Sequence, residues 1–69
     1  MRSLFANIES CIRGSRSNEN IIVSGDDYFG YDVIVGNRVV DSYSDFEHAI
    51  YAGCVYADDM TTHKEIFGT

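Results

Sequence analysis

The stretch YDVIVGNRVVDSYSDFEHAIYAGCVYADDM, residues 31–60, decides the fold because its hydrophobic period changes once along its length. YDVIV and RVVDSY are short β-branched runs typical of strands, and Gly36-Asn37 between them is a favoured two-residue hairpin turn. From Phe46 onwards, apolar and small residues recur at three- and four-residue steps, as on one face of a helix. The stretch therefore predicts a β-hairpin followed by a helix.

The start of this helix is marked by a capping box. Ser44 and Glu47 are three residues apart, so each side chain can bond the other's backbone amide, and Asp45 adds a negative charge at the positive end of the helix dipole. The pattern predicts a helix from Asp45 to Met60. Its buried face is predicted to consist of Phe46, Ala49, Ile50, Gly53, Ala57 and Met60.

The residues before this stretch add a strand and a helix to the prediction. NIIVS, residues 20–24, is a further β-branched run, which gives three antiparallel strands. Between Ser3 and Arg13, apolar residues recur at helical spacing and Gly14 supplies a stop, so a short N-terminal helix is predicted there. Residues 14–19 are predicted to be a flexible connector and residues 61–69 a frayed tail. The fold class is α+β, with the C-terminal helix packed on a three-stranded sheet.

Length and composition indicate a single domain over residues 1–69. An apolar fraction of 45% is that of a chain that folds, but 69 residues give a thin core, so self-association as a homodimer is one expectation. Two cysteines are too few for a disulfide framework, and residues 1–14 lack the continuous apolar run of a signal peptide. We therefore expect a cytoplasmic location and no membrane association.

Charge is distributed unevenly along the chain. Residues 1–18 carry a balance of +2, whereas residues 19–69 hold only Arg38 and Lys64 against ten acidic residues, a balance of −8. Because an anionic body repels phosphate backbones, we expect no direct binding of DNA or RNA.

The predicted outer side of the helix combines aromatic and acidic residues. It collects Glu47, His48, Tyr51, Val55, Asp58 and Asp59, with Ala52 and Tyr56 at its margins. Tyrosines ringed by charge are typical of a protein contact surface, because tyrosine gives large contact area at small entropic cost. Alternatively, these tyrosines lie against the first helix or in a self-dimer.

The hairpin suggests a second acidic site. If Gly36 and Asn37 form the whole loop in a regular ladder, Val33 pairs with Val40 and Asp32 lies opposite Asp41, where two like charges repel. Such a pair favours an arginine or lysine from a partner, since Asp26, Asp27 and their neighbours lack the ligand spacing of a calcium loop. A different register, or simple solvation of both acids, remains open.

Candidate catalytic and metal-binding groups are few. Cys54 with His48 as a base is disfavoured, because six residues along one helix exceed hydrogen-bond reach; both Cys54 and Cys11 are predicted to be buried structural thiols. His63 and Asp59 have i, i+4 spacing, but two ligands do not make a zinc site. The glycines form no phosphate-binding motif. The sequence therefore predicts no metal, no cofactor and no enzymatic activity.

In its order of a hairpin, a capped helix and alanines at packing positions, the 31–60 stretch resembles small acidic proteins encoded by bacteriophages, among them host RNA polymerase inhibitors and anti-CRISPR proteins. The resemblance covers less than half of the chain. It implies a non-catalytic inhibitor that covers a basic, nucleic-acid-binding surface of a host protein or ribonucleoprotein complex, such as a CRISPR effector; it assigns no individual residue.

Three functions follow as hypotheses: such an inhibitor, a small structural or assembly protein acting as a homo-oligomer, and, least favoured, a hydrolase or redox enzyme using Cys54 or the paired aspartates. The predicted partner-binding residues are Glu47, His48, Tyr51, Val55, Asp58 and Asp59 on the helix and Asp26, Asp27, Asp32 and Asp41 on the sheet side.

Overall fold

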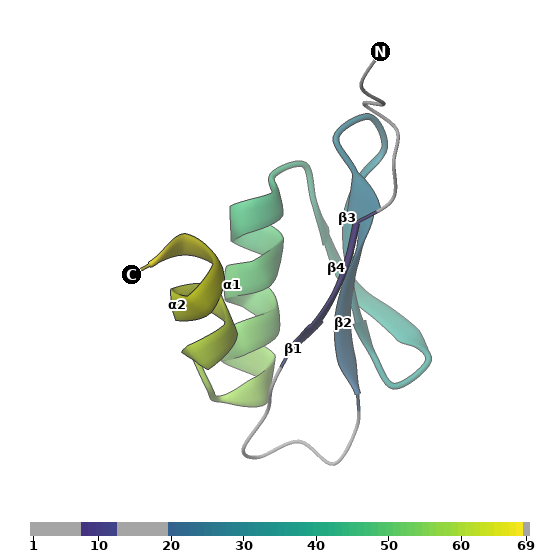
Figure 1. Ribbon diagram of the computed structural model, residues 1–69. Helices are drawn as coiled ribbons and strands as arrows, with labels where there is room; N and C mark the ends of the chain where they lie inside the picture. The colour runs from purple at the N-terminus through teal and green to yellow at the C-terminus, as the bar shows by residue number, and fades with distance from the viewer. Residues whose placement is uncertain (1–7, 13–19, 69) are drawn as a thin grey trace.

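The computed structural model describes residues 8–12 and 20–68, which form a four-stranded antiparallel sheet with two helices on one side of it (Figure 1). The strands β1 (Ile8–Ile12), β2 (Ile21–Asp26), β3 (Gly30–Val35) and β4 (Arg38–Tyr43) lie side by side in chain order. The helices are α1 (Phe46–Ala57) and α2 (Thr61–Phe67). The predicted α+β class is confirmed and each of the three predicted strands is present, but the predicted three-stranded sheet is wrong, because β1 adds a fourth strand next to β2.

The predicted N-terminal helix is wrong where the structure describes it. Residues 8–12 form β1, an edge strand that pairs with β2 and places Ile12 opposite Ile21. The rest of the predicted helix, residues 3–7 and 13, and the predicted connector, residues 14–19, lie outside the described residues. Ile12 is 5% exposed and belongs to the core, so burial of its side chain under α1 accounts for the strand.

The β3–β4 hairpin has the predicted turn but not the predicted register. Val35 pairs with Arg38 across Gly36-Asn37, as expected. A β-bulge then shifts the ladder, so that Val33 lies opposite Asp41 and Asp32 opposite Ser42. Since one extra residue moves the following side chains to the other face, Asp32 and Asp41 do not form the predicted pair.

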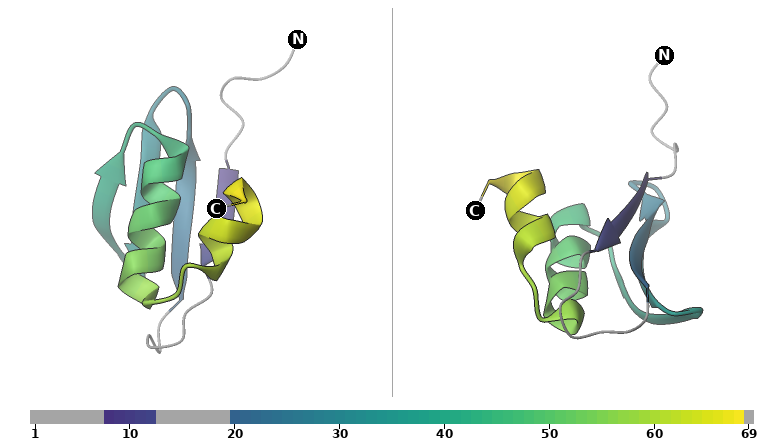
Figure 2. Two further views of the ribbon diagram at one scale, coloured as in Figure 1. Left: turned by 90° about the vertical axis from the view of Figure 1, so that its left-hand side faces the viewer. Right: turned by 60° about the horizontal axis from the view of Figure 1, so that its bottom comes forward.

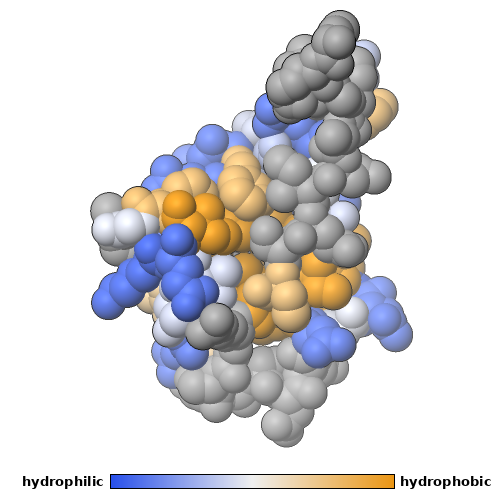
Figure 3. Space-filling view, in the orientation of Figure 1, coloured by the Kyte–Doolittle hydropathy of each residue, from blue (hydrophilic) through white to orange (hydrophobic). Residues whose placement is uncertain are grey.

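The core lies between the inner face of the sheet and α1. The sheet contributes Ile12, Ile21, Val23, Tyr31 and Val33; α1 contributes Ala49, Ile50, Cys54 and Ala57. Small residues on α1 allow close approach: a Cβ placed on Gly53 would lie 3.0 Å from Ile12 Cγ1. In the view of Figure 3 apolar residues gather in the middle of the molecule and polar residues occupy its margins. The predicted buried face of the helix is confirmed for Ala49, Ile50, Gly53 and Ala57, while Phe46 and Met60 are half-buried.

Both ends of α1 differ from the prediction. Asp45, not Ser44, is the N-cap, and its carboxylate accepts from the backbone N–H of His48 at 3.2 Å. Asp58 adopts a left-handed conformation with φ 59° and ends the helix three residues before the predicted Met60. A residue in this conformation stops a helix because its N–H turns back onto the last carbonyls, here those of Cys54 and Val55.

The predicted frayed tail is wrong for Thr61–Phe67, which form α2. This helix packs beside α1, as the two views of Figure 2 show. Phe67 contacts Phe46, with ring centroids 5.9 Å apart, so α2 closes over the first turn of α1. Neither helix has the length or the apolar character needed to cross a membrane.

Candidate protein-interaction face

The outer side of α1 follows from the residues that α1 buries. Because Gly53, Cys54 and Ala57 are buried against the core, the residues two positions from them on α1 face outwards. Three large side chains lie there: Tyr51 is 52% exposed, Val55 57% and Tyr56 44%. Glu47 and His48 are exposed on the same helix, as predicted.

A first hollow, of about 370 Å³, lies between α1 and β4. Its lining is mostly aromatic and is completed by one carboxylate: Asp41, Tyr43, His48, Tyr51, Ala52, Val55 and Tyr56. The Tyr43 hydroxyl donates to Asp41 Oδ2 at 2.8 Å. This hydrogen bond, together with burial and nearby negative charge, raises the pKa of Tyr43 above its ordinary value, so the hydroxyl stays neutral.

A second hollow, of about 360 Å³, adjoins the first at the start of α1. It shares His48 and Tyr51 with the first and adds Asp45, Glu47 and His63. Because the two hollows share side chains, they form one surface. We call it the tyrosine face and define it as Asp41, Tyr43, Asp45, Glu47, His48, Tyr51, Ala52, Val55, Tyr56 and His63.

His63 joins α2 to this face. It is 8% exposed, its Nε2 lies 3.3 Å from Glu47 Oε2, and its ring packs against Tyr51 and Phe67 at centroid distances of 5.9 and 5.0 Å. The sequence paired His63 with Asp59 on one continuous helix, but α1 ends at Ala57. The contact with Glu47 was missed because it joins two separate helices, of which the first is ended by the left-handed Asp58.

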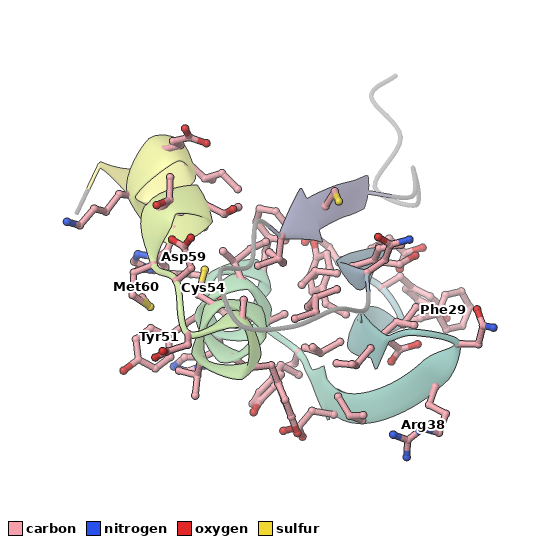
Figure 4. All side chains as sticks on the ribbon, turned by 90° about the horizontal axis from the view of Figure 1, so that it is seen from below. Phe29, Arg38, Tyr51, Cys54, Asp59 and Met60 are labelled. Atoms are coloured by element: carbon pink, nitrogen blue, oxygen red, sulfur yellow. The ribbon has the colours of Figure 1, made fainter. Side chains whose placement is uncertain are left out.

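The remaining predicted helix acids lie next to the tyrosine face. Asp58 and Asp59 line a third hollow with Cys54, Val55 and Met60. Asp59 Oδ1 accepts from the backbone N–H of Thr61, the first residue of α2, at 2.9 Å. Val55 lines both this hollow and the first, so the acids adjoin the tyrosines as the sequence suggested. Figure 4 shows Tyr51 and Asp59 on the helix side of the molecule.

The four predicted sheet-side acids are separated by the structure. Asp41 alone reaches the tyrosine face, since it shares the inner side of the sheet with its pair Val33. Asp32 lies on the opposite side and accepts from the Ser42 hydroxyl at 2.8 Å. Asp26 is buried at 5% exposure, and Asp27 Oδ1 accepts a hydrogen bond from the Tyr31 hydroxyl. The structure thus gives Asp26 a place in the turn rather than on a surface.

The two thiols differ in exposure. Cys54 is fully buried, as predicted, and burial raises the pKa of its thiol, which disfavours the reactive thiolate. Cys11 is exposed, so its prediction as a buried thiol is wrong. Within the described residues no three His, Cys, Asp or Glu side chains converge on a position that could hold a metal ion.

The part of the chain that the structure describes is strongly acidic. Residues 8–12 and 20–68 contain Arg38 and Lys64 against ten acids, a balance of −8. Arg38 lies at the β3–β4 turn and Lys64 on α2, and neither lines the tyrosine face. Comparisons of the chain with models of known protein families, with curated proteins and with solved structures gave no match.

Proposed function

We propose that the protein is a non-enzymatic binding module that inhibits a host complex by docking its tyrosine face on a basic, nucleic-acid-binding surface. In this proposal the protein is phage-encoded and acts in the host cytoplasm. It binds a protein or ribonucleoprotein, such as a CRISPR effector, and makes no direct contact with free nucleic acid.

The observation that carries the proposal is the composition of the tyrosine face. Tyr51, Val55 and Tyr56 are all exposed by 44% or more, and Asp41, Asp45 and Glu47 line the same two hollows. Aromatic side chains supply most of the binding energy at protein interfaces, while surrounding charges chiefly set the association rate and the choice of partner. The face therefore suits a partner that is apolar at its centre and basic at its rim.

The packing of the face supports the same proposal. α1 is fixed against the sheet by buried small residues, and His63 holds α2 against Glu47 and Tyr51. A surface that is already ordered loses little conformational entropy when it binds. The sheet, α1 and α2 thus present the two exposed tyrosines in a fixed arrangement.

Site-directed photocrosslinking tests this proposal with a matched control. Val55 on the tyrosine face and Val39 on the other side of the sheet are both 57% exposed. We expect a photoreactive benzoyl-phenylalanine at position 55, but not at position 39, to crosslink one protein in a bacterial lysate, and added heparin to compete. Crosslinking from position 39 alone would contradict the proposal.

Binding kinetics with the captured partner separate the contribution of the tyrosine face from that of the acids that adjoin it. Changing Asp58 and Asp59 together to asparagine should slow association and flatten its salt dependence, since asparagine keeps the Oδ1 acceptor for Thr61 and tolerates the conformation of residue 58. Tyr51→Ala should speed dissociation by the equivalent of about 2 kcal/mol or more if Tyr51 is a hot spot. Tyr51→Phe keeps the ring against His63 and serves as the control.

A homo-oligomer is the second candidate, and one observation favours it. On the outer face of the sheet, Cys11, Ile22, Ile34 and Val39 pair in sequence across all four strands, and no described element covers them. Analytical ultracentrifugation would show a concentration-dependent dimer, and Val39→Lys would abolish it, if this row is a self-interface. Crosslinking from position 39 to a second copy of the chain would give the same answer.

A further inference from the structure

The turn between β2 and β3 carries two aromatic side chains that the core does not use. Phe29 is 83% exposed and Tyr28 66%, and their rings meet edge to face with centroids 4.6 Å apart. Figure 4 shows Phe29 on the far side of the sheet from the helices and from Tyr51. Neither ring lines the two hollows of the tyrosine face, although the hollow beside the turn shares Tyr43 with the first of them.

The backbone that carries these rings is held in place by a buried carboxylate. Asp26, 5% exposed, accepts the backbone N–H of Tyr28 at 3.0 Å and that of Phe29 at 2.8 Å through the same Oδ1. Gly25 has φ 151°, and a Cβ there would lie 2.0 Å from the carbonyl oxygen of Gly30. The two strands thus approach too closely at the turn for any residue but glycine.

A fixed turn has a consequence for binding. An exposed aromatic on a mobile loop must be ordered when it binds, whereas one on a fixed turn needs little ordering. The ring of Phe29 also lies at a protruding position, where it can enter a pocket of another molecule. This arrangement is that of an anchor residue, a large apolar side chain that fills a pocket at the centre of an interface.

The charge around the turn restricts what the anchor can bind. Asp27 is exposed beside the rings and Asp32 is exposed on β3, the strand that follows the turn. Arg38 begins β4 and pairs with Val35, at the end of β3 away from the turn. Aromatic side chains that stack on bases, or that enter anionic membranes, are accompanied by lysine and arginine. Among the residues that the structure describes, the charged neighbours of this turn are carboxylates, which repel phosphates and attract cations.

We infer that the Tyr28-Phe29 turn is a second protein-binding anchor, which inserts Phe29 into an apolar pocket whose rim carries lysine or arginine on a partner protein. The inference goes beyond the proposed function, because neither aromatic side chain of the turn lines the two hollows of the tyrosine face. It holds whether the two surfaces bind one partner or two.

The test is photocrosslinking from position 29, where benzoyl-phenylalanine replaces one exposed aromatic with another. The full chain carrying the probe at 29, at 55, or at the exposed Ile66 of α2 as a control, is irradiated in a bacterial lysate, and the crosslinked peptides are sequenced. We expect position 29 to join a protein at a peptide that contains apolar residues and at least one lysine or arginine.

Binding measurements with the captured protein then test whether the ring of Phe29 and the charge of Asp27 contribute to the contact. Phe29→Ala should weaken binding roughly tenfold or more and Phe29→Leu clearly less, because leucine keeps most of the apolar bulk. Asp27→Asn should reduce the salt dependence of association. Circular dichroism should be unchanged for both Phe29 variants, since the ring lies outside the core.

Each other outcome overturns the inference. Crosslinking of position 29 to lipid, to nucleic acid or to a second copy of this chain would assign the turn to a different class of ligand. Equal binding by Phe29→Ala and the parent would show that the ring is not an anchor. If position 55 captures a partner and position 29 captures none, the inference fails and the proposed function stands; if only position 29 captures one, the reverse holds.

Discussion

Replacing Gly53 with leucine tests the contact between α1 and the sheet directly. A Cβ at this position would lie 3.0 Å from Ile12 Cγ1 and 3.5 Å from Val23 Cγ2, so even one added carbon is tight. Leucine gains roughly 0.8 kcal/mol of helix propensity over glycine. Overpacking a core costs about 1–3 kcal/mol, and four added carbons favour the upper part of that range. We therefore expect a net loss of about 2 kcal/mol.

Urea unfolding and thermal melting measure this loss. For a domain of this size, about 2 kcal/mol corresponds to a fall in Tm of roughly 8–16 °C. Val55→Leu places the same side chain on the exposed side of α1 and should change stability by less than about 0.5 kcal/mol.

A double-mutant cycle identifies the neighbour responsible. Ile12→Ala alone should cost about 2–5 kcal/mol, because it opens a cavity, but it also removes both carbons that crowd position 53. The double variant should therefore be more stable than the sum of the two single effects by about 1 kcal/mol or more. A Gly53→Leu protein that melts at or above the parent temperature, or strictly additive effects, would refute the placement of β1 under α1.

Three further predictions concern caps, alkaline pH and α2. Asp45→Ala should lower the free energy of unfolding in urea by about 1 kcal/mol, whereas Ser44→Ala should lower it clearly less, because Asp45 is the N-cap. Equal losses would indicate that Ser44 caps the helix as well, as the sequence predicted. The hydrogen bond from Tyr31 to Asp27, together with burial and nearby acids, raises the pKa of Tyr31 to about 12, so the stability that is present below pH 10 should be lost as the pH rises towards 12. Asp27→Asn should lower the Tyr31 pKa in a phenolate absorbance titration. An unchanged pKa would contradict this cause. His63→Ala should release α2 from α1, because a helix of seven residues is not stable alone. Backbone amide hydrogen exchange in Thr61–Phe67 should then be fast. Amides that stay protected from exchange would show that other contacts hold α2.

The strongest local signals in the sequence identified most of the fold correctly. The Gly36-Asn37 turn and the helical spacing after Phe46 are each specified by residues close together in the chain, and both appear in the structure. Local signals of this kind depend on a single period or a single turn type. They do not depend on what the segment packs against.

The first strand was missed because its local signal is ambiguous. Ile8 and Ile12 are four residues apart, which fits one helical face, but with Ser10 they also fit the alternation of a strand. Pairing with β2 decides between them, since the strand places Ile12 against Gly53 and gives β2 a second neighbour. This information lies in β2, which pairs with β1, and in Gly53, more than 40 positions away, and no pattern within residues 8–12 contains it.

The candidate site shows the same division between local and distant information. Helical periodicity alone places Tyr51 and Val55 on the outer side of α1, and the structure agrees. Asp41 reaches these residues only because the bulge in β4 turns it to the inner side of the sheet, opposite Val33. In a regular ladder Val40 would occupy that position, and the hollow would lack the carboxylate that accepts the Tyr43 hydroxyl. The extra residue in β4 therefore supplies the only carboxylate among the described residues that line the first hollow, and a bulge at this edge of the sheet also limits pairing with other strands.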